Sequence, residues 1–163
     1  MNADAAFLVA KAALEAIRTY YGEQGIVLPD ERQLVVSGLP SWDCEQVTIQ
    51  VETVSAQSGD PTLPGLTSRE ADPAFSLRTA TLGITIARCI PLSDDGSAPA
   101  DDDEEATSIL VYGDIGHVWN ALVEAQDAGL LPCCGGIGFL SWQGLGPEGG
   151  LVGGLQRIAV SLE

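Results

Sequence analysis

Four cysteines and a single histidine are the side chains of this sequence best suited to bind a metal or form a disulfide. The expected pairing of two long strands sets Cys44 opposite Cys89, at about the 5.5 Å between Cα atoms that a disulfide accepts. Cys133, Cys134 or His117 could complete a zinc set. However, the sequence has no Cys-x-x-Cys motif, and adjacent cysteines suit tetrahedral ligation poorly. We expect structural thiols, with a disulfide and a metal site as the alternatives.

The single histidine, His117, lies beside Trp119 and three residues after Asp114. A general base needs a partner nucleophile and an orienting group. The sequence offers no nucleophile elbow and no Ser or Cys in a recognisable setting, so we predict no catalytic residue and no enzyme activity. His117 is expected on a helix surface or at an interface. Trp42, Trp119 and Trp142 are expected in the core or at a subunit interface.

Acidic and glycine-rich segments suggest ion or phosphate binding, but their patterns do not support it. The low-complexity loop 92–105 lacks the alternating Asp/Asn and Gly pattern of a calcium loop, so we expect it to be solvated. The glycines of 135–138 and 144–154 precede no Gly-Lys-Ser/Thr, and no helix is expected to begin there. We therefore predict no metal and no cofactor. The loop contains seven acids: Asp94, Asp95, Asp101, Asp102, Asp103, Glu104 and Glu105.

The composition of the 163 residues limits the possible partners. Seven Lys+Arg against 23 Asp+Glu give a net charge of −16, while 45% of the residues are hydrophobic. This much apolar surface can form a core, and the length predicts one domain over residues 1–163. The acid excess argues against binding the phosphate backbone of nucleic acids or anionic membranes. No targeting segment or membrane span is expected, so synthesis in the cytoplasm is predicted.

Hydrophobic periodicity predicts a first helix over Asp4–Gly22, capped by Asn2 or Asp4. Strands are expected over Gln33–Ser37, Cys44–Gln57 and Ser76–Cys89. The second of these should have a solvated face, made by Gln46, Thr48, Gln50 and Glu52. The predicted register pairs Val47 with Ile86, Ile49 with Ile84 and Val51 with Leu82. The first helix should bury Phe7, Ala10, Leu14, Ile17 and Tyr21.

A second helix is expected to begin within the acidic run, since carboxylates suit the positive end of a helix dipole, and to stop at Gly129. Gly113 and Gly116 are expected to bend or interrupt it, with a strand over Ser108–Tyr112 as the alternative. Long loops are predicted at about 58–73 and 92–105. Two closing strands, Ile137–Trp142 and Leu155–Leu162, would be joined by a hairpin loop over Gly144–Gly154. The second helix should bury Ile109, Leu110, Val118, Trp119, Leu122 and Ala125.

The predicted fold class is α+β, with the order α-β-β-β-α-β-β. The simplest packing is one mainly antiparallel sheet with both helices on a single face. The other face would be solvated or covered by another subunit.

The whole pattern resembles the tail terminator proteins of long-tailed, non-contractile bacteriophages, especially those that infect actinobacteria. The likeness spans most of the chain except the two loops, and it includes no catalytic signature. The closing stretch contributes most to it. The segments that carry it are Ala12–Tyr21, Leu28–Ser37, Cys44–Thr53, Ser141-Trp142, Gly146–Gly154 and Leu155–Leu162.

The resemblance implies a virion protein that forms a homohexameric ring at the head-proximal end of the tail tube. The ring would stop tube polymerisation, contact the tail tube protein and join the head's connector or stopper protein. DNA would pass through its lumen without specific binding. The acids of 92–105 or 58–73 are expected to line or rim that lumen, and Ser58–Pro73 and Gly144–Gly154 to make ring contacts. The alternatives are a head–tail stopper or adaptor, a small metal-binding module, and an oligomeric scaffold unrelated to phages.

Overall fold

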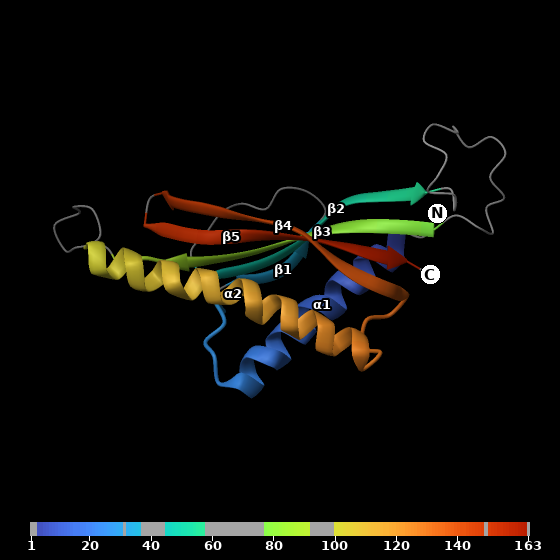
Figure 1. Ribbon diagram of the computed structural model, residues 1–163, viewed down its shortest axis with the longest axis horizontal. Helices are drawn as coiled ribbons and strands as arrows, with labels where there is room; N and C mark the ends of the chain where they lie inside the picture. Colours follow the sequence, from blue (N-terminus) through green and yellow to red (C-terminus); the bar gives the residue numbers. More distant parts are fainter. Residues whose placement is uncertain are drawn as a thin grey trace.

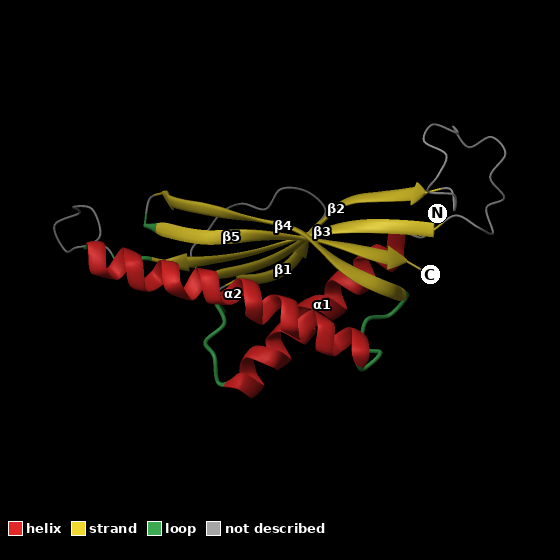
Figure 2. Cartoon of the chain, in the orientation of Figure 1, coloured by secondary structure: helices red, strands yellow, loops and turns green. Residues whose placement is uncertain are grey.

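The protein folds as a five-stranded sheet with two helices on one of its faces (Figures 1 and 2). The computed structural model describes residues 3–30, 32–36, 45–57, 77–91, 100–148 and 150–162. The predicted α+β class and element order are confirmed. The elements are α1 (Ala3–Gln24), β1 (Arg32–Val36), β2 (Gln46–Gln57), β3 (Leu77–Cys89), α2 (Asp101–Asp127), β4 (Cys134–Glu148) and β5 (Leu151–Leu162).

The strands lie in the order β1-β2-β3-β5-β4, so β1 and β4 form the two edges of the sheet. The pairs β2–β3, β3–β5 and β5–β4 are antiparallel, whereas β1 runs parallel to β2. The predicted register of Val47 with Ile86, Ile49 with Ile84 and Val51 with Leu82 is confirmed. The same alternation therefore sends one row of branched aliphatic side chains from each central strand toward the helices.

Helix α1 packs on the sheet through a face made largely of alanine and other aliphatic residues. Its buried positions recur every three or four residues, as expected for one face of an α-helix. Phe7 is an exception to the prediction, because it is 38% exposed and Ala6 and Val9 occupy the core instead. The buried face comprises Ala5, Ala6, Val9, Ala10, Ala13, Leu14, Ile17 and Tyr21.

Helix α2 is continuous, so the expected interruption at Gly113 and Gly116 and the alternative strand over Ser108–Tyr112 are wrong. A Cβ at Gly116 would have no neighbour within 4 Å, and a Cβ at Gly113 would meet only the His117 ring, at 3.8 Å. Neither glycine lies on the packed face of the helix. Ile109 and Leu110, expected in the core, are 64% and 54% exposed. The core face is rotated away from them and comprises Thr107, Val111, Asp114, Val118, Ala121, Leu122 and Ala125.

The face of β2 that points away from the helices is not solvated along its whole length. Gln46 and Thr48 are completely buried, whereas Thr53 beyond them is exposed. The expectation of a wet face is therefore wrong at the end of β2 that pairs with β1. Alternation separates the two faces of a strand, but it does not reveal which polar face is covered. Neither the Gln46 amide nor the Thr48 hydroxyl has a hydrogen-bond partner within the part of the chain described.

The expected loop over Gly144–Gly154 is mostly paired strand. Strands β4 and β5 extend through it and leave a short turn near Gly150, whose φ is 78°. A Cβ on Gly153 would lie 2.5 Å from the Ile86 carbonyl oxygen, and one on Gly154 would lie 2.5 Å from Nε1 of Trp142. These glycines allow a close approach inside the sheet, which explains why a glycine-rich segment forms strand here.

We expect Gly153→Ala to destabilise the protein by about 1–3 kcal/mol, because its new methyl group meets the backbone of β3, which cannot move aside easily. Gly116→Ala is the matched control. A Cβ at that position would have no neighbour within 4 Å, so alanine should stabilise α2 by about 0.5–1 kcal/mol. Urea unfolding monitored by circular dichroism measures both changes. Equal stability of the Gly153→Ala variant and the parent protein would contradict the close approach.

Candidate functional site

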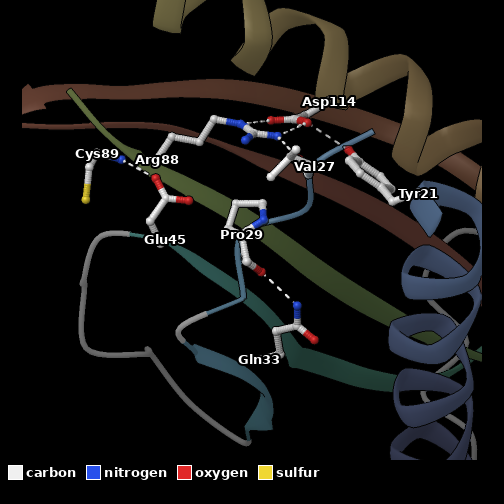
Figure 3. Close-up of polar contacts among 8 residues, drawn as sticks. All are labelled: Tyr21, Val27, Pro29, Gln33, Glu45, Arg88, Cys89 and Asp114. Atoms are coloured by element: carbon white, nitrogen blue, oxygen red, sulfur yellow. Dashed lines mark hydrogen bonds and ion pairs between the residues drawn. The ribbon is translucent and has the colours of Figure 1, made fainter. Parts of the chain in front are cut away.

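A buried ion pair joins the sheet to both helices (Figure 3). Arg88 of β3 donates from Nε to Oδ2 of Asp114 on α2 and from Nη2 to Oδ1, each at 2.8 Å. The hydroxyl of Tyr21 on α1 donates to the same Oδ1 at 2.8 Å. Arg88 Nη2 also donates to the Val27 carbonyl oxygen at 3.1 Å. One carboxylate and its arginine therefore hold two helices, one strand and the segment after α1 in a fixed arrangement.

The electrostatics of this cluster favour a fixed charge state. The side chains of Arg88 and Asp114 are only 7% and 6% exposed, so their charges are compensated almost entirely by each other. Burial by itself lowers the pKa of Arg88, but the hydrogen bonds and negative charge of Asp114 outweigh it and raise that pKa. Burial, followed by the charge of Asp114, raises the pKa of Tyr21. The cluster has the properties of a structural anchor, with its carboxylate occupied by protein donors.

The motifs of the sequence do not reveal this cluster. They mark Asp114 only as a neighbour of His117, and they do not single out Arg88. The available signal is positional: Arg88 continues the alternation of Ile84 and Ile86, and Asp114 lies on the same helical face as Val118. A charged residue on a core-facing position of each of two elements is a signature of a buried pair.

His117 lies in the contact between the helices. Its ring is half-buried, with centroids 5.7 Å from Tyr21 and 6.2 Å from Tyr20. Asn120, one position beyond Trp119, donates to the Tyr20 hydroxyl at 3.4 Å. The histidine thus belongs to an aromatic contact between α1 and α2 of the same chain.

The cysteines do not form a common cluster among the residues that the structure describes. Cys44, like Trp42, lies outside them, so its pairing with Cys89 remains a prediction. The Cys89 backbone N–H donates to Oε1 of Glu45 at 2.9 Å. Cys133 and Cys134 lie at the start of β4, where Cys133 has a φ of 56°. Within the described ranges, no three His, Cys, Asp or Glu side chains are close enough to hold a metal ion.

Only part of the acidic segment 92–105 lies within the described residues. Asp94 and Asp95 lie outside the described residues, and so does the loop Ser58–Pro73. Asp101–Glu105 form the first turns of α2, where Asp101, Asp102 and Asp103 are exposed. Their position at the N-terminus of the helix agrees with the favourable interaction of carboxylates and the helix dipole.

An exposed apolar surface runs along α2 and the edge strand β4. Tyr112 of α2 packs on Trp142 of β4 with 5.1 Å between ring centroids, and Trp119 packs edge-on to Phe139 at 6.1 Å. Phe139 and Tyr112 nevertheless remain exposed. We call this the α2/β4 surface, made of Ile109, Tyr112, Trp119, Phe139, Leu140 and Trp142.

Strand β4, at one edge of the described sheet, lacks the charged side chains that commonly protect an edge along most of its length, although its pairing with β5 has three register shifts. No Asp, Glu, Lys or Arg occurs in the twenty residues from Ala128 to Pro147. Exposed edge strands are commonly kept apart by charged residues, proline or shortness, and β4 has 15 residues with its proline only at the far end. A long edge without charged residues as far as Pro147, beside exposed aromatic residues, indicates an interaction surface.

On the sheet face opposite the helices, one ion pair crosses the central strand. Arg157 of β5 donates to Glu52 of β2 at 2.9 Å, and the two residues reach each other above Gly83 of β3. A Cβ on Gly83 would lie 2.7 Å from Oε1 of Glu52, so glycine makes room for the pair. The pair makes this part of the face electrically neutral.

Comparison with protein-family models and with curated protein sequences finds no match. Neither helix that the structure describes combines the length and apolar character needed to cross a bilayer.

We expect Asp114→Ala to cost about 3–5 kcal/mol of unfolding free energy, because it leaves the Arg88 guanidinium buried without its counter-charge. The double variant Arg88→Met/Asp114→Leu removes both charges and keeps apolar volume, so its loss should be well below the sum of the losses of its component single variants, Arg88→Met and Asp114→Leu. Urea unfolding of the parent, both single variants and the double variant gives the coupling energy. Additive losses would contradict an anchoring role of the pair.

The raised pKa of Tyr21 predicts a specific loss of stability in alkali. Below about pH 10 the tyrosine is protonated in both the folded and unfolded chains, so the contribution of protonated Tyr21 to the free energy of unfolding is fully present there. Above that pH only the unfolded chain ionises it, and the stabilisation falls by about 1.4 kcal/mol per pH unit. Unfolding free energies measured from about pH 9 to 11.5 should therefore fall more steeply for the parent than for Tyr21→Phe. Equal slopes would show that Tyr21 ionises normally.

Proposed function

We propose that this protein is a tail terminator of a long-tailed, non-contractile bacteriophage. The observation that carries the proposal is the element order α-β-β-β-α-β-β with both helices on one face of a single sheet. The resemblance of the sequence to tail terminators rests on the same element order. The proposed role is structural: the protein caps the head-proximal end of the tail tube and contacts the head's connector or stopper protein.

The α2/β4 surface supports assembly with other subunits. Exposed aromatic and aliphatic side chains beside an edge strand whose one charged residue, Glu148, is its last gain stability when another chain covers them. A ring forms when the same heterologous contact repeats and its rotation closes. In the proposed function six copies form this ring, and the tube protein lies against one of its ends.

The charge distribution supports passage of DNA without retention. Helix α2 carries eight carboxylates and no Lys or Arg, and five of them form its first turns at Asp101–Glu105. We propose that these acids rim the lumen and repel the phosphates of passing DNA. A ring with a basic lumen and Asp101–Glu105 on its outer rim would contradict this part of the proposal.

Deletion of the gene in the phage that encodes this protein tests the function. Without a terminator, tube polymerisation should continue beyond its normal length, so electron microscopy should show overlong tails without heads. A plasmid-borne copy should restore normal, head-joined tails. Tails of normal length joined to heads in the deletion would overturn the proposal. Tails of normal length that fail to join heads would instead favour a head–tail stopper or adaptor.

A further inference from the structure

The two edge strands of the described sheet run in opposite directions. Strand β1 is parallel to β2, and three antiparallel steps then lead through β3 and β5 to β4. If a second copy stands beside the first with its strands pointing the same way, β4 of one copy meets β1 of the other in antiparallel fashion. In an antiparallel pair the hydrogen bonds run perpendicular to the strands, so the outward N–H and C=O groups of one edge can pair with those of the other.

Charge distinguishes this pairing from a contact between two β4 edges. Helix α2, which lies under the β4 side of the sheet, carries eight acids and no base. Helix α1 and β1 together carry three acids and three bases, with Lys11, Arg18 and Arg32 as the bases. Apart from Asp114, which is paired with Arg88, a β4–β4 contact would place two α2 helices with seven acids each side by side, whereas a β4–β1 contact places α2 beside elements whose formal charges sum to zero.

The β1 side also offers a place for the exposed apolar side chains. A groove of about 400 Å³ lies between α1 and β1, on the helix-bearing side of that edge. Its lining includes the apolar residues Ala12, Leu14 and Val35, the cation Lys11, and Arg18, which is bonded to Glu15 and Gln33 in the same groove. Phe139 and Tyr112 of the α2/β4 surface lie on the corresponding side of the β4 edge, beside α2. A projecting apolar surface at one edge thus matches a partly apolar groove at the other.

We infer that subunits of this protein associate head to tail, with β4 of one copy paired antiparallel to β1 of the next. The inference deepens the proposed function and rests on its ring of identical subunits. One such contact pairs the five residues of β1 with part of the 15-residue β4, so in a closed ring each copy has a neighbour at both edges of its described sheet. The sheets of neighbouring subunits then join into one continuous sheet around the ring.

The sheet register identifies positions that this contact brings together. Leu34 is paired with Thr48, which is paired with Thr85, then Leu155 and finally Gln143. Leu34 and Gln143 therefore lie on one row and on one face of the sheet. If neighbouring subunits are offset along their strands, the offset must be an even number of residues, because an odd offset would place the paired side chains on opposite faces. Ser141 and Leu145 are therefore the nearest alternatives to Gln143 as partners of Leu34.

Disulfide trapping tests the contact in the full-length chain with its four cysteines replaced by serine. Leu34→Cys is combined in turn with Ser141→Cys, Gln143→Cys or Leu145→Cys, and far-UV circular dichroism verifies folding. We expect at least one pair to give, on oxidation, a ladder of covalent oligomers on a denaturing gel that disappears on reduction. Failure of all three folded pairs to form a ladder would overturn the inference.

Two controls identify the geometry. Leu34→Cys combined with Glu23→Cys, an exposed position at the end of α1, should give no ladder. Gln143→Cys alone should remain monomeric on the gel, because head-to-tail contacts never bring two copies of Gln143 together. Efficient dimer formation by Gln143→Cys alone would reveal a β4–β4 contact and overturn the inference.

A charge pair introduced across the contact gives a second test, which keeps the natural cysteines. Arg32 and Gln143 are both exposed and occupy neighbouring rows on the same sheet face. Arg32→Glu should weaken self-association about tenfold in sedimentation velocity, and Arg32→Glu/Gln143→Lys should restore it. Failure of the second substitution to restore association would overturn the contact.

The outcomes separate this inference from the proposed function. Overlong tails in the gene deletion together with no ladder and no charge rescue would overturn the β4–β1 contact and leave the terminator function supported. A ladder together with normal, head-joined tails in the deletion would support the contact and overturn the terminator function.

Discussion

The buried pair of Arg88 and Asp114 fixes how the layers of this protein fit together. The rest of the core consists mainly of Ala, Val, Ile and Leu, whose contacts have no preferred direction and would tolerate sliding of a helix along the sheet. The pair and the Tyr21 hydroxyl define one position of α1 and α2 on β3, because each hydrogen bond depends on distance and angle. Figure 2 shows α1 crossing α2 on one face of the sheet, and the rings of Tyr21 and His117 meet between the two helices.

Fixing the helices in this way determines what remains on the surface. With Asp114 directed toward β3, the same helix must turn Ile109 and Tyr112 outward, near the edge formed by β4. The exposed apolar side chains are therefore a consequence of how α2 is anchored, and they lie beside a long charge-free segment of the chain. In a protein with a net charge of −16, such a segment offers subunits a contact without strong like-charge repulsion.

Features that depend on residues close in sequence could be predicted, whereas features that depend on contacts between distant segments could not. The register of Val47, Ile49 and Val51 against β3 was predictable, because alternation and matching strand lengths are local signals. The burial of Gln46 and the glycine-rich pairing of β4 with β5 were not, because both depend on neighbours distant in sequence. The buried pair was missed for the same reason, since Arg88 and Asp114 are 26 residues apart and belong to different elements.

The sequence by itself determined the order of the elements, the fold class and the aliphatic faces of α1 and β3, because period and propensity act over a few neighbouring residues. Tertiary structure alone decided the rotation of α2, the burial of Gln46 and Thr48, and the exposure of Phe139 and Leu140 at an open edge. These features arise from packing between distant segments, where a single partner such as Asp114 decides which side of a helix turns inward.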